Sequence, residues 1–458
     1  MSQNIEQKLK DFEKEGIKHV KFGLTDIDGV LRGKYISMDK FRSVASGKGR
    51  FCDCILGWDV DDQLYDNATF TGWHTAFPDG RYRLDFTTER RLSDEGGIPF
   101  YLGEFVGADG PDSHPVCPRS MLRRVLRRAE DMGYGVNLAF EYEFNVFKES
   151  PQSIREKNYQ NLIPLSPGMF GYTILRKTWL SGPFNEFMEY FRNLDIEIEG
   201  LHCETGPGVW EASIMYDSGI RGADKANLFK TFSKTFFLKR EMLATFMAKW
   251  SLAYPGQGGH LHHSLFDVKS GESIFFDESA PHCMSERMCQ FLAGLQKYMR
   301  PFLVMSAPVI NSYTRLVKGA WAPTSATWGV DNRTTALRAI PGDDKSQRIE
   351  FRVAGADGNP YLVAAAVIGA GLKGIEQKLS LDEPVKGNAY EVQDDLPEEL
   401  RLPTDLKDAT RLFAQSKEAR ELFGEEFVNH FVSTREWEVR EHEKQITDWQ
   451  MNRYFEII

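Results

Sequence analysis

The segment 135–147, GVNLAFEYEFNVF, constrains the fold most, because apolar and polar residues alternate along its whole length. In an extended strand, successive side chains point to opposite faces. One face would carry Val136, Leu138, Phe140, Tyr142, Phe144 and Val146, and the other Asn137, Ala139, Glu141, Glu143 and Asn145. The pattern predicts a strand that packs on a core and presents two adjacent carboxylates. Taken alone, the solvated outer face of an edge strand explains this segment equally well.

Three later segments repeat this arrangement of polar residues over an apolar backing. Their polar residues are Glu199, His202, Glu204 and Glu211 in EIEGLHCETGPGVWEASI; His260, His262 and Ser264 in GGHLHHSLFD; and Arg348, Glu350 and Arg352 in RIEFRV. A Gly-Pro-Gly turn between Glu204 and Glu211 would bring these two carboxylates to one cavity. We therefore expect several strands to direct charged faces toward the same place.

These charged faces predict a metal site. A lone histidine such as His260 is more often a surface or core residue than a ligand. Glutamates that gather on strands with an apolar backing are different, because buried like charges require a compensating cation. The donors are nearly all oxygen, which favours Mg²⁺ or Mn²⁺ over zinc. Hard divalent metals in turn suggest phosphate chemistry.

A cation-rich region follows, with Arg315, Arg333, Arg338 and Lys345. Guanidinium groups clamp carboxylates and transferring phosphoryl groups, so this region suits a nucleoside triphosphate and a carboxylate bound together. Singly, each arginine is better explained by a surface ion pair. The sequence has no Walker P-loop or kinase-type glycine loop that would offer a different nucleotide site.

Composition excludes several classes of protein. A hydrophobic content of 41% and a charged content of 27% are ordinary for a folded globular chain. The net charge of -10 argues against nucleic acid or anionic membranes as partners. The six cysteines are scattered and fit no zinc spacing, so we expect reduced thiols. No apolar run approaches the roughly 18 residues of a membrane span, and we expect a cytoplasmic protein.

The order of the segments predicts an α+β fold with two domains, residues 1–112 and 113–458. An amphipathic first helix, a hairpin in HVKFGLTDIDGVLRGKYI and further short strands suggest a small sheet domain. The stretch GADGPDSHPVCPRS is typical of a linker. Strands and helices alternate after it, and PYLVAAAVIGAGLKGIEQKL predicts a buried helix with Asn359 as N-cap and Pro360 as first residue.

In order and spacing, these segments resemble the signature segments of glutamine synthetases. The matching segments are FEYEFNVF, HCETGPGVWE, GGHLHHSL, NSYTRLVKGAWAP, DNRTTALRAIP and RIEFRVAGADGNPYL, and TDIDGVLRGKYI matches the family's N-terminal domain. The resemblance covers nearly the whole chain and is far more specific than a single glycine loop. It implies an N-terminal β-grasp domain, a C-terminal catalytic domain built on a barrel-like antiparallel sheet, and a homo-oligomer of two stacked rings, a dodecamer, with active sites shared between subunits.

The resemblance also implies roles for individual residues. One metal would be held by Glu143, Glu204 and Glu211, and a second by Glu141, His260 and Glu350. The ATP site would be lined by Glu199, Tyr216, His262, Ser264, Arg338, Lys345 and Arg348, with Tyr216 stacked on adenine. Arg315 and Arg352 would clamp the carboxylates of glutamate, and Arg333 would contact the transferring phosphoryl group. Gly256, Tyr172 and Trp321 would complete the substrate site.

The sequence departs from ammonia-using members of the family where they handle ammonium. They carry a glutamate in the flap after the NSY-R-L-V-x-G motif, and this sequence has Trp321. Their Asp-Gly-Ser-Ser stretch is replaced by FCDCILGWDVDD, and an asparagine that helps to seat glutamate is replaced by Pro255 beside the retained Gly256. An indole suits an amine that carries carbon, or an ammonium held by a cation–π contact of about 0.5–2 kcal/mol. Simple packing of the flap is the alternative explanation for Trp321.

The sequence therefore resembles the branch of the family that makes γ-glutamylamides, and we expect an ATP-dependent ligase that joins glutamate to a small organic amine. One alternative is a glutamine synthetase that uses ammonia. Another is a non-catalytic relative with a structural or regulatory role, against which the retained ligands argue. Two features stay open: Asp53, Asp59, Asp61 and Asp62 suggest either a polyamine site or a solvated acidic loop, and Tyr390 occupies a position that some bacterial members adenylylate.

Overall fold

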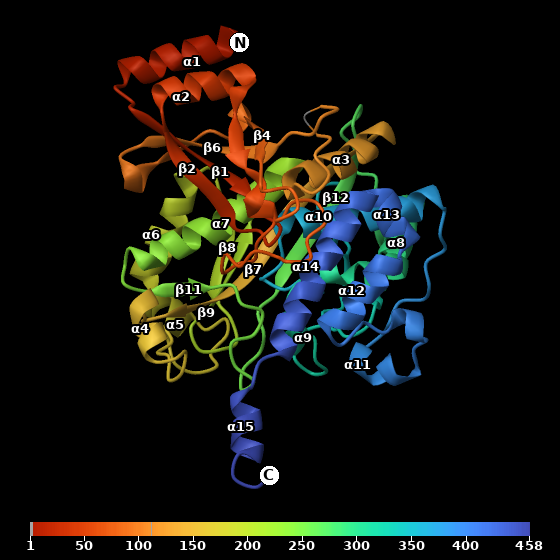
Figure 1. Ribbon diagram of the computed structural model, residues 1–458. Helices are drawn as coiled ribbons and strands as arrows, with labels where there is room; N and C mark the ends of the chain where they lie inside the picture. Colours follow the sequence, from red (N-terminus) through yellow and green to blue (C-terminus); the bar gives the residue numbers. More distant parts are fainter. Residues whose placement is uncertain (1–2, 111) are drawn as a thin grey trace.

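The computed structural model describes residues 3–110 and 112–458, which form two sheets and the helices packed around them (Figure 1). The α+β class predicted from the sequence is confirmed. The predicted domain boundary near residue 112 falls between the last strand of the first sheet and the helix that follows it. This boundary remains a prediction.

The first sheet has the order β2-β1-β6-β4-β3, with β5 paired to β6. Its strands are β1 (His19–Thr25), β2 (Leu31–Ser37), β3 (Arg50–Cys52), β4 (Asp79–Leu84), β5 (Arg90–Leu92) and β6 (Ile98–Phe105). β1 pairs antiparallel with β2 and parallel with β6, so the predicted hairpin is confirmed. Its turn is closed by the Asp26 carboxylate, which accepts hydrogen bonds from the amides of Asp28 and Val30, while Gly29 adopts a φ of +85°.

The second sheet has the order β13-β14-β15-β12-β7-β9-β8, and β10 and β11 also pair with β7. Its strands are β7 (Tyr134–Phe147), β8 (Ile198–Cys203), β9 (Val209–Ile214), β10 (Asp217–Ser218), β11 (Leu243–Thr245), β12 (Gly259–Asp267), β13 (Trp328–Val330), β14 (Leu337–Ile340) and β15 (Arg348–Phe351). The pairs are antiparallel except β13 with β14. Strand β15 ends at Phe351, earlier than the alternation in RIEFRV suggests, although the amide of Arg352 still donates to the carbonyl of Ala336 in register with β14.

The helices cover these sheets (Figure 1). They are α1 (Gln3–Lys14), α2 (Met38–Ser43), α3 (Pro118–Asp131), α4 (Pro151–Glu156), α5 (Ile174–Trp179), α6 (Ser181–Arg192), α7 (Ile220–Leu238), α8 (Glu286–Phe302), α9 (Ser312–Arg315), α10 (Pro360–Glu376), α11 (Ala389–Val392), α12 (Leu406–Gln415), α13 (Lys417–Phe423), α14 (Glu425–Glu443) and α15 (Asp448–Tyr454). Each helix in the described ranges is too short or too polar to cross a membrane.

The apolar face of β7 packs on the core, as its alternation predicts. The six apolar side chains from Val136 to Val146 are each at most 2% exposed. Tyr142 stacks on Phe229 of α7, and Phe144 stacks on Phe187 of α6. The aromatic contacts immobilise the strand, so the carboxylates on its opposite face are held on a rigid support.

Helix α10 fills the space between α8 and the helices beside it. The predicted cap is confirmed, since the Asn359 side chain accepts a hydrogen bond from the amide of Tyr361 at 3.1 Å and Pro360 is the first residue. The two helices cross closely at Gly294 and Gly374, where a Cβ on Gly374 would lie 2.1 Å from the carbonyl oxygen of Gln290. Only glycine permits this approach.

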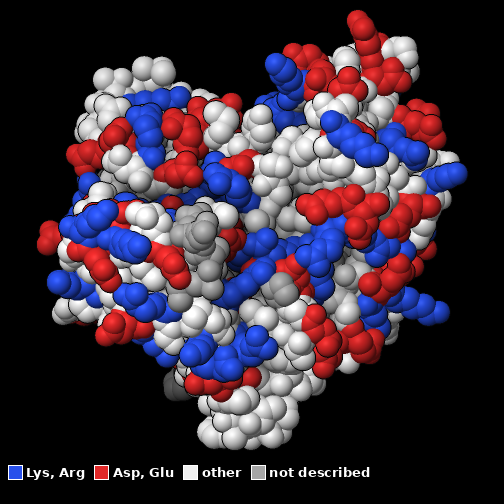
Figure 2. Space-filling view, turned by 90° about the horizontal axis from the view of Figure 1, so that it is seen from above, with Lys and Arg blue, Asp and Glu red and all other residues white. Residues whose placement is uncertain are grey.

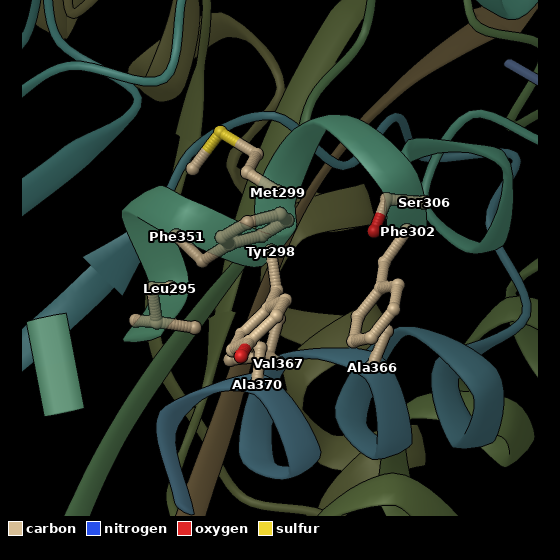
Figure 3. A pocket seen from close by; sticks show the side chains of 9 residues that line it. All are labelled: Leu295, Tyr298, Met299, Phe302, Ser306, Phe351, Ala366, Val367 and Ala370. Carbon is tan, nitrogen blue, oxygen red and sulfur yellow. The ribbon is translucent and has the colours of Figure 1, made fainter. Parts of the chain in front are cut away.

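A small cavity of about 10 Å³ remains between α8, α10 and Phe351 of β15 (Figure 3). Tyr298 and Phe302 of α8 face Ala366, Val367 and Ala370 of α10 across it. A space of this size holds at most a single water molecule, and its walls are almost wholly apolar. We interpret it as a packing gap in the core.

Buried ion pairs join the first sheet to the helices behind the second. Arg119 of α3 is fully buried and donates to Glu104 of β6 at 2.8 Å, to Asp85 at 2.8 Å and to both carboxylate oxygens of Asp224 of α7 at 2.8–2.9 Å. Tyr361 of α10 also donates to Asp224, at 2.7 Å. On the surface, Lys and Arg are interspersed with Asp and Glu over the face seen in Figure 2.

We predict that Arg119→Met destabilises the protein by about 3–5 kcal/mol, because it leaves the buried Asp224 without its cation and removes one of the three arginines that pair with Glu104. The free energy of unfolding in urea, measured at one protein concentration, checks this. The matched control is Arg420→Met, which removes an exposed ion pair with Glu425 and should cost less than about 1 kcal/mol. Equal effects of the two substitutions would contradict a structural role for the buried cluster.

Candidate active site

Strand register brings the charged residues of the second sheet into adjacent rows on one face. In the first row, Glu143 of β7 lies opposite Glu211 of β9, and Glu211 lies opposite His202 of β8. In the next row, Glu141 of β7 lies opposite His260 of β12. Directly opposed residues have Cβ atoms about 4.5–5.5 Å apart. Segments far apart in the sequence thus form one cluster.

A third row continues this face toward the sheet edge. His262 of β12 lies opposite Glu350 of β15, which lies opposite Arg338 of β14. Arg338 donates to Glu350 Oε2 at 2.9 Å, and Arg352 donates to Glu350 Oε1 at 2.5 Å. Glu350 is therefore the carboxylate through which the acidic rows contact the arginines.

The first group of candidate metal ligands comprises His202, Glu204 and Glu211, whose donor atoms lie within 4.8 Å of one another. His202 Nε2 is 3.1 Å from Glu204 Oε2 and 3.6 Å from Glu211 Oε1. Glu143 lies beside Glu211, and its Oε2 accepts a hydrogen bond from the amide of Gly258 at 2.5 Å. Burial and then the charges of Glu141, Glu143 and Glu204 raise the pKa of Glu211 to about 10.

The second group surrounds His260, whose Nδ1 is 3.4 Å from Glu141 Oε1 and 3.5 Å from Glu350 Oε1. A donor atom of His262 also lies within 4.8 Å of one oxygen each of Glu141 and Glu350. Burial opposes ionisation of Glu350, but Arg352 and the two histidines outweigh it and lower its pKa to about 2.

Both groups fit divalent cations. Each offers carboxylate oxygens and an imidazole nitrogen within reach of one ion, which is a donor set suited to Mn²⁺ and, with water, to Mg²⁺. Burial is the main cause of the raised pKa of Glu211, and repulsion by the neighbouring carboxylates adds to it. A cation at this position would remove that repulsion.

A cleft of about 480 Å³ opens beside the second group. Six of the seven predicted nucleotide-binding residues line it, namely Glu199, Tyr216, His262, Ser264, Lys345 and Arg348. Glu141 lines it as well, so the cleft reaches the candidate metal ligands. The seventh residue, Arg338, lies outside this lining and pairs with Asp331 and Glu350. The volume is within the range of roughly 300–1,000 Å³ that small-molecule sites occupy.

Two predicted carboxylate clamps lie buried near the Gly256 loop. Arg315 donates to the carbonyl oxygens of Val353 at 2.9 Å and Arg352 at 3.2 Å, and burial lowers the pKa of Arg315. A Cβ on Gly256 would lie 2.6 Å from Arg315 Cγ, so glycine is needed there. The Nε of Arg352 is buried and has no hydrogen-bond partner among residues 3–110 and 112–458. It is a donor available to an anionic ligand.

The other predicted substrate residues are exposed. Trp321 is 63% exposed and adopts a φ of +57°, so packing within this chain does not account for its indole. Tyr172 is also 63% exposed, and its ring stacks on His202 with a centroid distance of 4.2 Å. Arg333 is exposed as well.

The structure also describes the two features that the sequence left open. Most of the acidic loop is engaged within the chain, since Asp53 accepts a hydrogen bond from Thr71, Asp59 from two loop amides, and Asp62 pairs with Arg32. Tyr390 donates its buried hydroxyl to the carbonyl of Ala322, next to Trp321, at 2.9 Å.

One site residue has a place in this geometry that sequence reasoning did not give it. The sequence places His202 among the polar residues of its segment but assigns it no role. The signal was its position two residues before Glu204 in a strand whose neighbour carries Glu211. Its significance depends on the register between β8 and β9.

Residues 115–454 match the family model described as glutamine synthetase, catalytic domain. The chain is 45% identical to type-1 glutamine synthetase 2 of Dictyostelium discoideum, over 96% of this chain and 84% of that protein. It is 36% identical to glutamate–isopropylamine ligase of a Pseudomonas species, over 98% of each chain. It is 33% identical to γ-glutamylethanolamide synthetase of Streptomyces coelicolor, over 96% of this chain and 93% of that one.

Solved structures of GmaS, one without ligand and one with ADP, superpose with a TM-score of 0.84 at 23% identity, covering 98% of this chain and 99% of theirs. At this level of identity, the likeness shows a shared fold.

We predict that Glu211→Gln stabilises the metal-free protein at pH 8 and reduces its stabilisation by Mn²⁺ or Mg²⁺ to what the second ligand group provides. The pKa of Glu211 rises from 4.5 to about 10 on folding, so the metal-free protein loses stability as the pH rises through this window. Glutamine removes that pH-dependent loss and removes an anionic ligand. Melting temperatures from pH 5 to pH 9, with and without metal, check both effects. A variant that melts as the wild type does under every condition would contradict this assignment.

Proposed function

The chain belongs to the glutamine synthetase family and is an ATP-dependent ligase, and from this premise we propose that it forms a γ-glutamylamide from glutamate and a small organic amine. The observation that carries the proposal is the exposed indole of Trp321 in the segment that follows the buried Arg315 of α9. Two relatives that match nearly the whole chain are named for joining glutamate to isopropylamine and for forming γ-glutamylethanolamide. The relative at 45% identity is named a glutamine synthetase, so ammonia is the competing acceptor.

In the proposed reaction, an oxygen of the glutamate side-chain carboxylate attacks the γ-phosphorus of ATP, and ADP leaves. The amine nitrogen then attacks the acyl carbon of the γ-glutamyl phosphate, the bond to the phosphate oxygen breaks, and a proton is released. Water must be kept away from the acyl phosphate, because hydrolysis would waste it. Anionic phosphate takes part in both steps, first as the group transferred and then as the leaving group, so electrostatic stabilisation by the protein is central.

The residues of the site have distinct proposed roles in these steps. Tyr216 stacks on the adenine, and His262, Ser264, Lys345 and Arg348 bind the remainder of ATP in the cleft that they line. Arg315 and Arg352 orient glutamate, and Arg333 stabilises the charge on the transferring phosphoryl group. Mg²⁺ or Mn²⁺ at the two ligand groups would neutralise phosphate charge when bound.

Trp321 determines the choice of amine in this proposal. A carboxylate in the flap would bind an ammonium ion and accept its proton, whereas an indole offers apolar area and a π face. An alkyl or aryl group loses its contact with water against such a surface, and ammonia has no such group. The indole therefore favours an organic amine over ammonia.

The decisive experiment measures phosphate release by the purified protein with ATP, Mg²⁺ and glutamate, with ammonium and with a panel of alkyl, hydroxyalkyl, aryl and polyamines. We expect turnover with at least one organic amine to exceed turnover with ammonium at equal concentration. A preference for ammonium would overturn the proposal in favour of a glutamine synthetase. If no amine causes phosphate release, the proposal would be overturned in favour of a substrate acid other than glutamate or of a non-catalytic role.

We predict that Trp321→Glu lowers the ratio of kcat/KM for the best organic amine to that for ammonium by roughly 2- to 30-fold, the range that corresponds to a lost cation–π contact. Trp321→Phe is the matched control, because it keeps an aromatic face and should change the ratio less. Steady-state kinetics with both acceptors give the ratio. An unchanged ratio in Trp321→Glu would show that the indole does not select the amine.

The proposal includes a cytoplasmic homo-oligomer of two stacked rings, a dodecamer, with active sites shared between neighbouring subunits. It is supported by the C-terminal segment 446–458, in which α15 projects from the body (Figure 1). Trp449, Phe455, Ile457 and Ile458 are 62–93% exposed there. An apolar arm of this kind is suited to bury itself against a second copy of the chain.

Removal of residues 446–458 should therefore reduce the size of the assembly, because the arm's apolar contacts with another copy are lost. Mass photometry of the full-length and shortened proteins at equal concentration checks this. The control replaces only Lys444, an exposed residue next to the arm that pairs with Glu441, by alanine, and should leave the mass unchanged. An unchanged mass after truncation would contradict the role of the arm.

A further inference from the structure

We propose that His202 is a direct ligand of the metal ion held by Glu204 and Glu211, and that Tyr172 fixes the orientation of its imidazole. The inference rests on the proposed metal-dependent function and goes beyond it. The resemblance to the family assigns this ion to Glu143, Glu204 and Glu211 alone. A nitrogen ligand changes the chemistry of the position.

The position of Nε2 is the first argument. It lies 3.1 Å from Glu204 Oε2 and 3.6 Å from Glu211 Oε1, and the three donor atoms are close enough to share one ion. The register places His202 directly opposite Glu211, and Glu204 follows His202 by two residues. Backbone pairing, and not a flexible loop, thus sets the direction in which the imidazole points.

The charge balance is the second argument. Glu211 is repelled by the carboxylates of Glu141, Glu143 and Glu204. The imidazole of His202 lies within ion-pair distance of both Glu204 and Glu211. One oxygen of Glu143 is already engaged by the amide of Gly258. A divalent ion supplies the positive charge that this group needs, and a neutral imidazole then offers its lone pair to that ion.

Tyr172 acts as the positioning residue. Its ring lies 4.2 Å from the imidazole, with an angle of 21° between the planes. Its backbone amide donates to the carbonyl of Cys203 at 2.8 Å, and a Cβ on Gly171 would lie 2.7 Å from Thr205 Oγ1. The backbone of residues 171–172 is therefore packed on the Cys203–Thr205 stretch. The strained φ of +59° at Tyr172 places the ring over His202, which restricts its rotation.

The consequence is a preference among metal ions. Imidazole binds first-row transition ions more readily than Mg²⁺, which prefers oxygen donors and retains water. The ratio of Mn²⁺ affinity to Mg²⁺ affinity should therefore be larger for a site that includes His202 than for a site of carboxylates alone.

The test is Mn²⁺ binding to the full-length protein without substrates. Titration followed by electron paramagnetic resonance gives the affinities, and electron spin echo modulation detects nitrogen bonded to the ion. We expect the wild type to show nitrogen coupling at two bound ions, from His202 and His260. In His202→Asn, one ion should lose its nitrogen coupling and bind at least about 10-fold more weakly, with a reduced preference over Mg²⁺.

Three variants make the outcome specific. His19→Asn, an exposed histidine at the start of β1, should bind Mn²⁺ as the wild type does. Tyr172→Ala should lower the affinity for the Mn²⁺ ion at His202. Tyr172→Phe should bind that ion as the wild type does, because phenylalanine keeps the stacked ring. Melting of the metal-free variants shows whether each is folded.

Several outcomes would overturn the inference. Unchanged nitrogen coupling in His202→Asn would mean that His202 is an ion-pair partner and not a ligand. Absence of bound Mn²⁺ in the wild type would remove the site itself. These outcomes are separate from the fate of the ligase proposal, which is decided by turnover with amines and needs no variant of His202.

Discussion

Repulsion among carboxylates on one face of the second sheet is the constraint on which the rest of the structure depends. Glu143 and Glu211 oppose each other directly, and Glu141 lies in the adjacent row. Flexible carboxylates would move apart, but the aromatic side chains packed behind β7 hold the strand in place. The fold therefore holds like charges together at a place where cations would bind, and this repulsion lowers the stability of the metal-free protein.

Carboxylate charge is compensated differently at the two ends of the charged face. Glu350 is paired with Arg338 and Arg352, and protein charges lower its pKa, so this carboxylate is ionised without a metal. Glu211 receives no comparable compensation and needs a metal most. The face thus changes from a preformed ion-pair network beside the nucleotide cleft to a site whose charge balance depends on bound cations.

The sequence predicted much of this, and the failures have identifiable physical causes. Alternation in GVNLAFEYEFNVF predicted both the buried face and the paired carboxylates, because side-chain period and burial are local properties of a strand. The Asn359 cap and the Asp-Gly hairpin were predicted for the same reason. The place of His202 was not, because it depends on the β8–β9 register, which contains a shift between Ile198 and Gly200. The end of β15 at Phe351 and the exposure of Trp321 also depend on contacts and backbone angles that alternation does not encode.

The order in which the strands occur along the chain has a consequence for synthesis on the ribosome. β7 emerges early, β12 pairs with it more than a hundred residues later, and β15 closes the edge of β12 only after residue 351 has been translated. Until then, the nascent chain carries an open strand edge bearing His262 and an unfinished charged face. Non-local pairing of this kind slows folding, so this interval is when the protein is most exposed to aggregation and most dependent on chaperones.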